Sequence, residues 1–242
     1  MTQSRDWQTE SFRFTFLGCP DAAASLITWA SLVGREADSV TVKKAQGLRN
    51  EEGIWDGMHL SISATPGRVD ILLNPVMPES MPNFEAIPNI GELQPVAQRL
   101  CDRLTAMTLP ASSRLAVGAK MMSFTDDSAS ALTLMKKYLP FLEVDLASID
   151  VAFQHNLPKR IRQSGIDLNR LSKWGQMTMH FIPVMPQPGQ GVPPGVARVT
   201  HGLQVELDIN TSPNSNLPAP AAYAPIIREM FAELVATSPL GS

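Results

Sequence analysis

The stretch that decides the fold runs from Trp174 to Asn210. It closes with the segment Val205-Glu206-Leu207-Asp208-Ile209-Asn210, in which apolar and polar residues alternate. Alternation with a period of two is typical of a strand that buries one face. A shorter stretch from Trp55 to Asn74 closes in a similar way, with Val69-Asp70-Ile71-Leu72-Leu73-Asn74. Each stretch is predicted to be a hairpin that opens at its Trp, and the recurrence indicates an internal duplication.

The segments around the two hairpins follow the same order in both halves of the chain. For the first half we expect a strand over 12–17, a helix over 22–33, a short strand with Val40 and Val42 inward, a loop over 45–53, a hairpin of 57–63 and 68–74 with a Pro66-Gly67 turn, and a helix over 92–107. For the second half we expect a strand over 115–121, a helix capped by Asp126 or Asp127 and running to about Tyr138, a strand at Val151 and Phe153, a hairpin of 176–183 and 198–209, and a helix over 223–236. Both closing helices carry a Pro in the first turn, Pro95 and Pro225, where its missing N–H costs nothing.

These patterns predict an α+β fold built from internally duplicated β-α-β-β-β-α units. Two such units are expected to form a pseudo-twofold, mainly antiparallel curved sheet of roughly eight strands, with helices on one face. The first repeat is placed at 1–110 and the second at 111–242, packed together as one domain. A chain of 242 residues is compatible with one duplicated domain.

The composition limits the classes of protein that the chain can belong to. Hydrophobic residues make up 44% and charged residues 18%, as in ordinary globular proteins. A net charge of −3 shows no global basic character that would favour nucleic acid or an anionic membrane. No apolar run approaches the ~20 residues needed to cross a bilayer, so a cytoplasmic protein is expected. The two cysteines, Cys19 and Cys101, are expected to be reduced thiols, and a single bridge between them stays open.

The chain carries no motif that would identify a reaction. Phosphate-binding glycine loops, the nucleophile elbow and the zinc-protease helix motif are all absent from the sequence. Matching the apolar faces of the long hairpin places His180 and His201 on opposite sides of the sheet, which disfavours a metal pair. Glu206 and Asp208, echoed by Asp70, are interpreted as the solvated face of a strand rather than an acid–base pair. We therefore predict no catalytic, metal or cofactor site.

The most distinctive local feature is positive charge. The segment 159–173 contains five basic residues and one acid, Asp167. The corresponding place in the first half, segment 43–49, is also basic. In a pseudo-twofold sheet the two segments would lie at related positions and could contact phosphates or an acidic partner, although solvated loops have the same composition. The candidate contact residues are Lys43, Lys44, Arg49, Lys159, Arg160, Arg162, Arg170 and Lys173.

The tip of the long hairpin is a second candidate contact region. Residues 183–196 are rich in proline, and long loops of this kind often bind partners, although a tip without fixed structure is an equal alternative. The candidate residues in this tip are Met185, Pro186, Val192 and Pro193.

Two resemblances accompany this layout. The order of strands and helices resembles the TATA-binding-protein fold, in which two related units form a saddle. The segment Leu207-Asp208-Ile209 before an amphipathic helix is similar to a sporadically distributed family of uncharacterised bacterial proteins, in which a Leu-Asp-Ile-Asp strand precedes the last helix. In this chain Asn210 stands in place of the second Asp. Neither resemblance implies a site or an activity.

The sequence thus favours a non-catalytic protein of bacterial type that binds another macromolecule or acts as an accessory. A protein partner is expected, nucleic acid is the first alternative, and no membrane is expected. The first alternative is a saddle that binds nucleic acid through segments 43–49 and 159–173. The second is an enzyme with its site between the repeats. The oligomeric state stays open.

Overall fold

The structure is a computed structural model, and it describes residues 7–77, 87–162, 164–181 and 198–240. Ten strands form one sheet in the order β2-β3-β4-β5-β1-β6-β10-β9-β7, and β8 pairs with β9. Every pairing is antiparallel. The strands are β1 (Gln8–Cys19), β2 (Ser39–Lys43), β3 (Leu48–Trp55), β4 (Met58–Thr65), β5 (Gly67–Pro75), β6 (Arg114–Thr125), β7 (Ala152–Asn156), β8 (Lys159–Arg160), β9 (Asp167–Phe181) and β10 (Arg198–Thr211).

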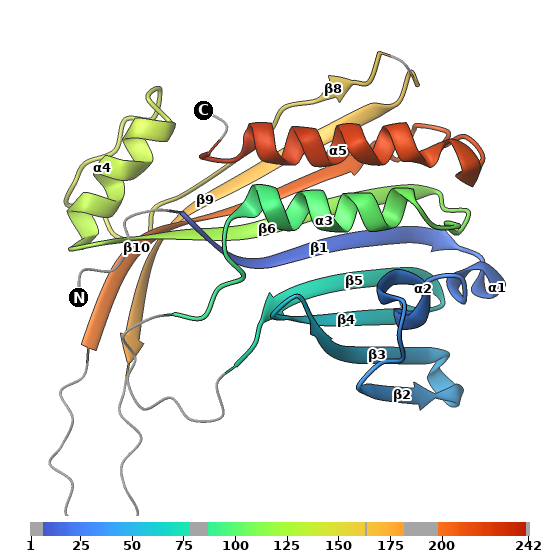
Figure 1. Cartoon of the computed structure of the whole chain (residues 1–242). Coiled ribbons are helices and arrows are strands. Elements are labelled where there is room, and N and C mark those ends of the chain that lie inside the picture. The colour runs from blue at the N-terminus through green and yellow to red at the C-terminus, as the bar shows by residue number, and fades with distance from the viewer. Residues whose placement is uncertain (1–6, 78–86, 163, 182–197, 241–242) are drawn as a thin grey trace, which may run out of the picture.

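The helices are packed on one face of this sheet. They are α1 (Asp21–Ala24), α2 (Trp29–Val33), α3 (Leu93–Thr105), α4 (Ser128–Tyr138) and α5 (Tyr223–Thr237), with short 3₁₀ turns η1 (Lys44–Gln46) and η2 (Pro220–Ala222). Figure 1 shows α3 and α5 side by side over the middle of the sheet. The other face of the sheet, which we call the open face, carries polar side chains such as Arg13, Thr15 and Asp208, and Figure 1 shows no described helix on it.

The core lies between the sheet and these helices. In β1, Phe12, Phe14 and Phe16 are fully buried, and the ring of Phe231 on α5 lies 5.7 Å from those of Phe12 and Phe14. One buried cluster includes side chains from both halves of the chain. Since each apolar side chain of this size contributes about 1.5–3 kcal/mol when buried, the alternating phenylalanines explain why β1 lies at the centre.

Several local predictions are confirmed. The β4–β5 hairpin forms at Pro66-Gly67, and Gly67 has a φ of 76°, as the third position of a type II turn requires. Asp127 is the N-cap of α4, and its side chain accepts a hydrogen bond from the Ser130 N–H. Helices α3 and α5 lie at the expected places. The α+β class and the mainly antiparallel sheet are also confirmed, while the duplication and the pseudo-twofold stay predictions.

The prediction of one helix over 22–33 is wrong. Two short helices form instead, because Thr28 and Ser31 build a capping box that starts α2 anew. Arg49 then binds the carbonyl of Ile27, between the two helices, through Nη2 at 2.6 Å.

The edge of the first half also differs from its prediction. Residues 48–55 form strand β3, where a loop was expected. Glu51 lies in β3 among the buried residues and accepts a hydrogen bond from the Trp29 N–H at the start of α2. Val40 and Val42 in β2 are not inward; 56% and 55% of their surfaces are exposed. The described residues of each half therefore form five strands rather than four, because strand β3 in the first half and the two-residue β8 in the second were not predicted.

Two pattern-based expectations about the hairpins are also wrong. Trp55 ends β3 at a turn, and Trp174 lies in the middle of β9, so neither opens a hairpin. In the β9–β10 register His201 faces Thr178 and Val199 faces His180. All four side chains therefore share one face, so His180 and His201 are not on opposite sides. The apolar residues of β9 that guided the prediction, Met177 and Met179, lie on its open face, whereas Trp174 faces the core.

Candidate functional site

A pocket lies between the segment around β8 and the start of α5. It has a volume of about 720 Å³. We call it the β8–α5 pocket, and its lining residues are Lys159, Arg160, Ile161, Arg162, Ser164, Asn216, Pro218, Ala222, Pro225, Ile226 and Glu229. It includes three of the basic residues that the sequence indicated as contacts.

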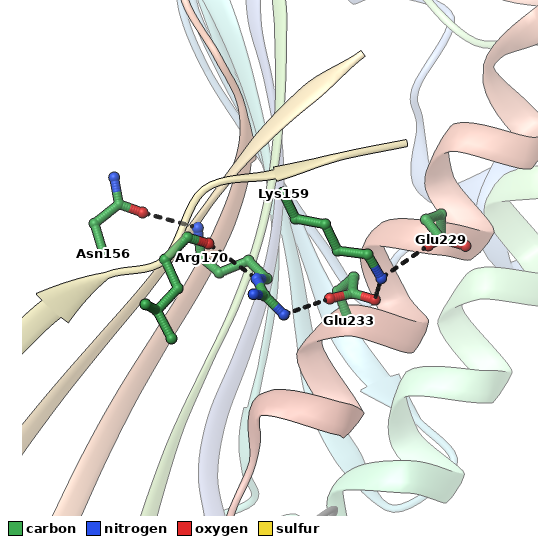
Figure 2. Close-up of polar contacts among 6 residues, drawn as sticks. Asn156, Lys159, Arg170, Glu229 and Glu233 are labelled. Atoms are coloured by element: carbon green, nitrogen blue, oxygen red, sulfur yellow. Dashed lines mark hydrogen bonds and ion pairs between the residues drawn. The ribbon is translucent and has the colours of Figure 1, made fainter. Parts of the chain in front are cut away.

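One side of the pocket is held by an ion-pair network around Glu233 (Figure 2). Glu233 is only 6% exposed and projects from α5. Its carboxylate accepts hydrogen bonds from Lys159 on β8 and from Arg170 on β9, the latter at 2.9 Å. Lys159 also lies 3.4 Å from Glu229, one turn earlier on α5. A buried carboxylate is tolerated only when it is paired, so these two cations fasten the β8–β9 segment to α5.

Arg170 and Lys159 are thereby committed to internal contacts. The Arg170 backbone N–H donates to Asn156 Oδ1 at 3.0 Å, and its Nε donates to the Leu157 carbonyl at 2.9 Å. The hydrogen bond to Glu233 raises the pKa of Lys159, so its ammonium group is held in the charged form. Neither cation is free to neutralise an external anion without breaking the network.

Arg160 and Arg162 have a different environment. The side chain of Arg160 is 69% exposed and lies 3.5 Å from a half-exposed carboxylate, Asp167. Such exposed pairs contribute little, so Arg160 can exchange Asp167 for another anion. Arg162 is exposed as well. Two guanidinium groups therefore line the pocket without a strong internal partner among the described residues.

Another part of the pocket lining is mostly apolar. It is formed by Pro218, by Ala222 of η2, and by Pro225 and Ile226 in the first turn of α5. That turn contains no acidic residue. The partial positive charge of the helix end is therefore not offset within the turn. The arrangement can hold an anionic group beside an apolar one.

The remaining basic candidates lie elsewhere. Lys43 and Lys44 are exposed at the end of β2, whereas Arg49 turns toward the helices and contacts Ile27 and Glu51. Lys173 lies opposite Glu206 on the open face of the sheet. Strands β2 and β9 are seven strand spacings apart, roughly 34 Å at about 4.8 Å per spacing. The structure thus brings together Lys159, Arg160, Arg162 and Arg170 but not the two basic segments.

The carboxylates of the open face are partly paired. Asp208 accepts a hydrogen bond from Arg13 at 2.8 Å and another from Asn210 at 2.6 Å. Asp70 binds Thr15 at 2.7 Å and Arg68 at 2.5 Å. Glu206 is exposed. The Thr15 contact joins the neighbouring strands β1 and β5, the Arg13 contact reaches from β1 across β6 to β10, and the Arg68 and Asn210 contacts lie within β5 and β10.

The histidines and thiols do not assemble a reactive centre in the described part of the chain. No group of three or more His, Cys, Asp or Glu residues suited to a metal ion occurs there. Cys19 and Cys101 are free and buried, and burial raises the pKa of each thiol. Burial also raises the pKa of Tyr223, whose hydroxyl donates to the Ser112 carbonyl at 3.1 Å. None of these three groups lines the β8–α5 pocket.

The second predicted contact region lies outside the described residues. Met185, Pro186, Val192 and Pro193 all fall within 182–197, so the proposed role of the hairpin tip stays a prediction.

Sequence reasoning missed the acidic and apolar sides of the pocket. Glu229 and Glu233 are spaced as neighbours on one helix face, and Glu233 stands beside the buried Met230 and Leu234. An acidic residue within the apolar stripe of a helix was the available signal, because such a carboxylate needs a partner from another element. Pro218 and Pro225 gave no comparable signal.

Comparison with family models, with curated proteins and with solved structures gave no match. The resemblances to the TATA-binding-protein fold and to the bacterial family therefore stay untested. Among the described residues, no helix is both long and apolar enough to span a bilayer. Any functional conclusion rests on the geometry of the chain itself.

Proposed function

We propose that the protein binds an acidic, partly apolar segment of a partner protein in the β8–α5 pocket and does not itself catalyse a reaction. The proposal rests on a difference among the clustered cations: two of them are paired inside the protein and two are exposed. Lys159 and Arg170 are used internally by Glu233, whereas Arg160 and Arg162 are exposed at the pocket.

The chemistry of the pocket favours a peptide carboxylate. A guanidinium group binds a carboxylate through two parallel hydrogen bonds, which adds geometric specificity. Pro218, Pro225 and Ile226, which also line the pocket, offer apolar contact to a neighbouring side chain of the same peptide. A volume of about 720 Å³ accommodates a few residues rather than a folded domain. The expected ligand is therefore a short extended segment with Asp or Glu beside an apolar residue.

A role in binding nucleic acid is supported less well than a role in binding a peptide. Binding that depends on phosphates needs several free cations along one surface. Here Lys159, Arg170 and Arg49 are engaged internally, and the exposed cations of the two basic segments lie toward opposite ends of the strand order, since seven strand spacings separate β2 from β9. An enzymatic function has the weakest support of the three. The thiols of Cys19 and Cys101 and the phenol of Tyr223, whose pKa values are raised, do not line the pocket.

The test is a selection of phage-displayed random peptides on the immobilised protein, followed by affinity measurements on the selected peptides. We expect enrichment of sequences with Asp or Glu next to an apolar residue. The double variant Arg160→Glu, Arg162→Glu is expected to bind these peptides at least about tenfold more weakly, since each lost bidentate contact to a charged group costs about 1.5–3 kcal/mol. The matched control is Lys43→Glu, Lys44→Glu, which makes the same change in net charge at a distant site.

Each outcome of this test decides between the alternatives. Peptides without acidic residues, or equal affinity for both double variants, would contradict the proposal. Retention of the unmodified protein on single-stranded or duplex DNA at low salt, reduced by both double variants, would support the nucleic-acid alternative instead.

We also propose that the two halves arose by duplication. The strand order supports it: outward from the central β1–β6 pair, β5 and β4 follow on one side, as β10 and β9 do on the other. The outermost strands differ, because β3 and then β2 complete the first side, whereas β7 and β8 both pair with β9 on the second. Each half also closes with a long helix, α3 or α5. A superposition of 7–110 on 111–240 in which corresponding strands fail to coincide would contradict the duplication.

A further inference from the structure

Strand β2 leaves one edge of the sheet uncovered. It is the last strand in the order, and no described strand pairs with its outer edge. All five of its residues are exposed, and Figure 1 shows no helix beside its outer edge. Its backbone therefore presents unpaired N–H and C=O groups that another strand can bind.

The strand has few of the features that usually protect such an edge. It is short, which does protect it, but it contains no proline and its pairing with β3 contains no bulge. Its one charged residue, Lys43, stands at the end rather than in the middle. Val40 and Val42 share one face and are each more than half exposed. Two exposed valines on an unpaired edge strand favour association with another apolar surface.

The sequence of β2 is complementary to itself. When two copies run antiparallel with Thr41 opposite Thr41 of the second copy, Val40 faces the second copy's Val42, and Val42 faces the second copy's Val40. Four valines then lie together on one face. In the same register Lys43 faces Ser39 of the second copy, so no like charges oppose each other.

The charges beyond the two ends of the strand also agree with this pairing. Asp38 precedes β2; its side chain is 51% exposed, although it already pairs with Arg35 at 2.9 Å and accepts a hydrogen bond from the Ile54 N–H at 2.9 Å, whereas Lys43 and Lys44 stand at the opposite end. Antiparallel pairing brings the acidic end of each copy to the basic end of the other, twice in a symmetric dimer. From these observations we propose that two copies of this chain pair through β2 and continue the sheet from one copy into the other.

The other edge strand fits this role less well. In β7, Phe153 is half-buried, and its ring lies 5.5 Å from that of Phe141 in the preceding segment. Pairing β7 with itself about Gln154 would set Phe153 against His155 of the second copy. The interface therefore forms at β2, and because a five-residue strand contributes little area, the dimer is a weak one.

The experiment measures self-association of the whole chain by sedimentation equilibrium up to about 1 mM protein. The unmodified chain is expected to reach a monomer–dimer equilibrium in this range. Val40→Asp alone and Val42→Lys alone are each expected to weaken the dimer at least about tenfold, because each buries charges without partners. Both substitutions in one chain are expected to restore the affinity, because the register sets each introduced acid opposite an introduced base. The matched control is Gln154→Asp in β7, and circular dichroism checks that each variant is folded.

A chain that is monomeric throughout this range overturns the proposal. A dimer that the single substitutions leave unchanged overturns the assignment to β2. A double variant as weak as the single variants overturns the register about Thr41. A dimer that Gln154→Asp alone weakens places the interface at β7.

Discussion

At the scale of single residues, Glu233 decides what the basic segment can do. Five cations within fifteen residues indicate a phosphate-binding surface when only the sequence is considered. One buried carboxylate on a distant helix turns two of them inward. The free energy of desolvating a carboxylate is large enough to reorient long flexible cations, whereas a solvated loop offers them no comparable gain.

This arrangement predicts a specific cost for removing the carboxylate. Glu233→Gln leaves Lys159 and Arg170 partly buried without their acceptor. We expect it to lower the free energy of unfolding by about 1–3 kcal/mol, less than for a fully buried pair because both cations are partly exposed. Urea denaturation followed by circular dichroism measures it. Glu206→Gln, on an exposed carboxylate of the open face, is the control and should change stability by under about 0.5 kcal/mol. Equal effects of the two variants would contradict the structural role of Glu233.

The ion pair between Lys159 and Glu233 also predicts how the stability of the protein depends on pH. The pKa of Lys159 is raised above the ordinary lysine value of 10.5. Its contribution to stability is therefore fully present below that value, and it is lost as the pH rises through the higher pKa of the folded state. The stability difference between the unmodified chain and Glu233→Gln should accordingly shrink at strongly alkaline pH and not at pH 6–9.

At the scale of elements, local signals predicted turns and caps better than they predicted the outer strands. Pro66-Gly67 and Asp127 act through their own backbone geometry, so neighbours in sequence suffice to identify them. Strand β3 lacks strong alternation, since Arg49 and Glu51 take core-facing positions and are satisfied by the backbone around α2. Only contacts between elements explain why a polar segment is a strand there.

The turn between β4 and β5 yields a prediction at this scale. Gly67 has a φ of 76°, a left-handed conformation that costs other residues about 1–2 kcal/mol. Gly67→Ala is expected to lower the free energy of unfolding by about that amount. Gly175→Ala in β9 is the matched control, because an added Cβ there meets no atom within 4 Å. Thermal denaturation of the two variants measures the difference, and a Gly67→Ala variant as stable as the control would argue against the type II turn.

At the scale of the whole molecule, the two halves share one core. Strands β1 and β6 pair along nearly their full length, and α3 packs against α5. The rings of Trp7 and Trp174, one from each half, lie 5.9 Å apart. A single hydrophobic cluster spans both halves, so neither half has a closed core of its own.

Expressing the two halves as separate chains tests whether they share one hydrophobic core. Residues 1–110 alone would expose Phe12 and Phe14, which Phe231 covers in the intact chain. We therefore expect each half, expressed alone, to lack a cooperative unfolding transition. Co-expression of 1–110 with 111–242 is expected to give a folded complex that elutes as one species. A cooperative transition in either isolated half would show that the halves are separate domains.

The sequence by itself determined the α+β class, the antiparallel hairpins, the cap of α4 and the two long helices. These features follow from periodicity and from turn chemistry, which act over a few neighbouring residues. The tertiary structure alone decided which cations are free, which faces the histidines of β9 and β10 share, and that β2 forms an exposed edge. Each of these depends on contacts between residues far apart in the chain, such as Lys159 with Glu233 or Thr178 with His201. Burial of a charge or a methyl group is a property of the packed molecule, and no local pattern contains it.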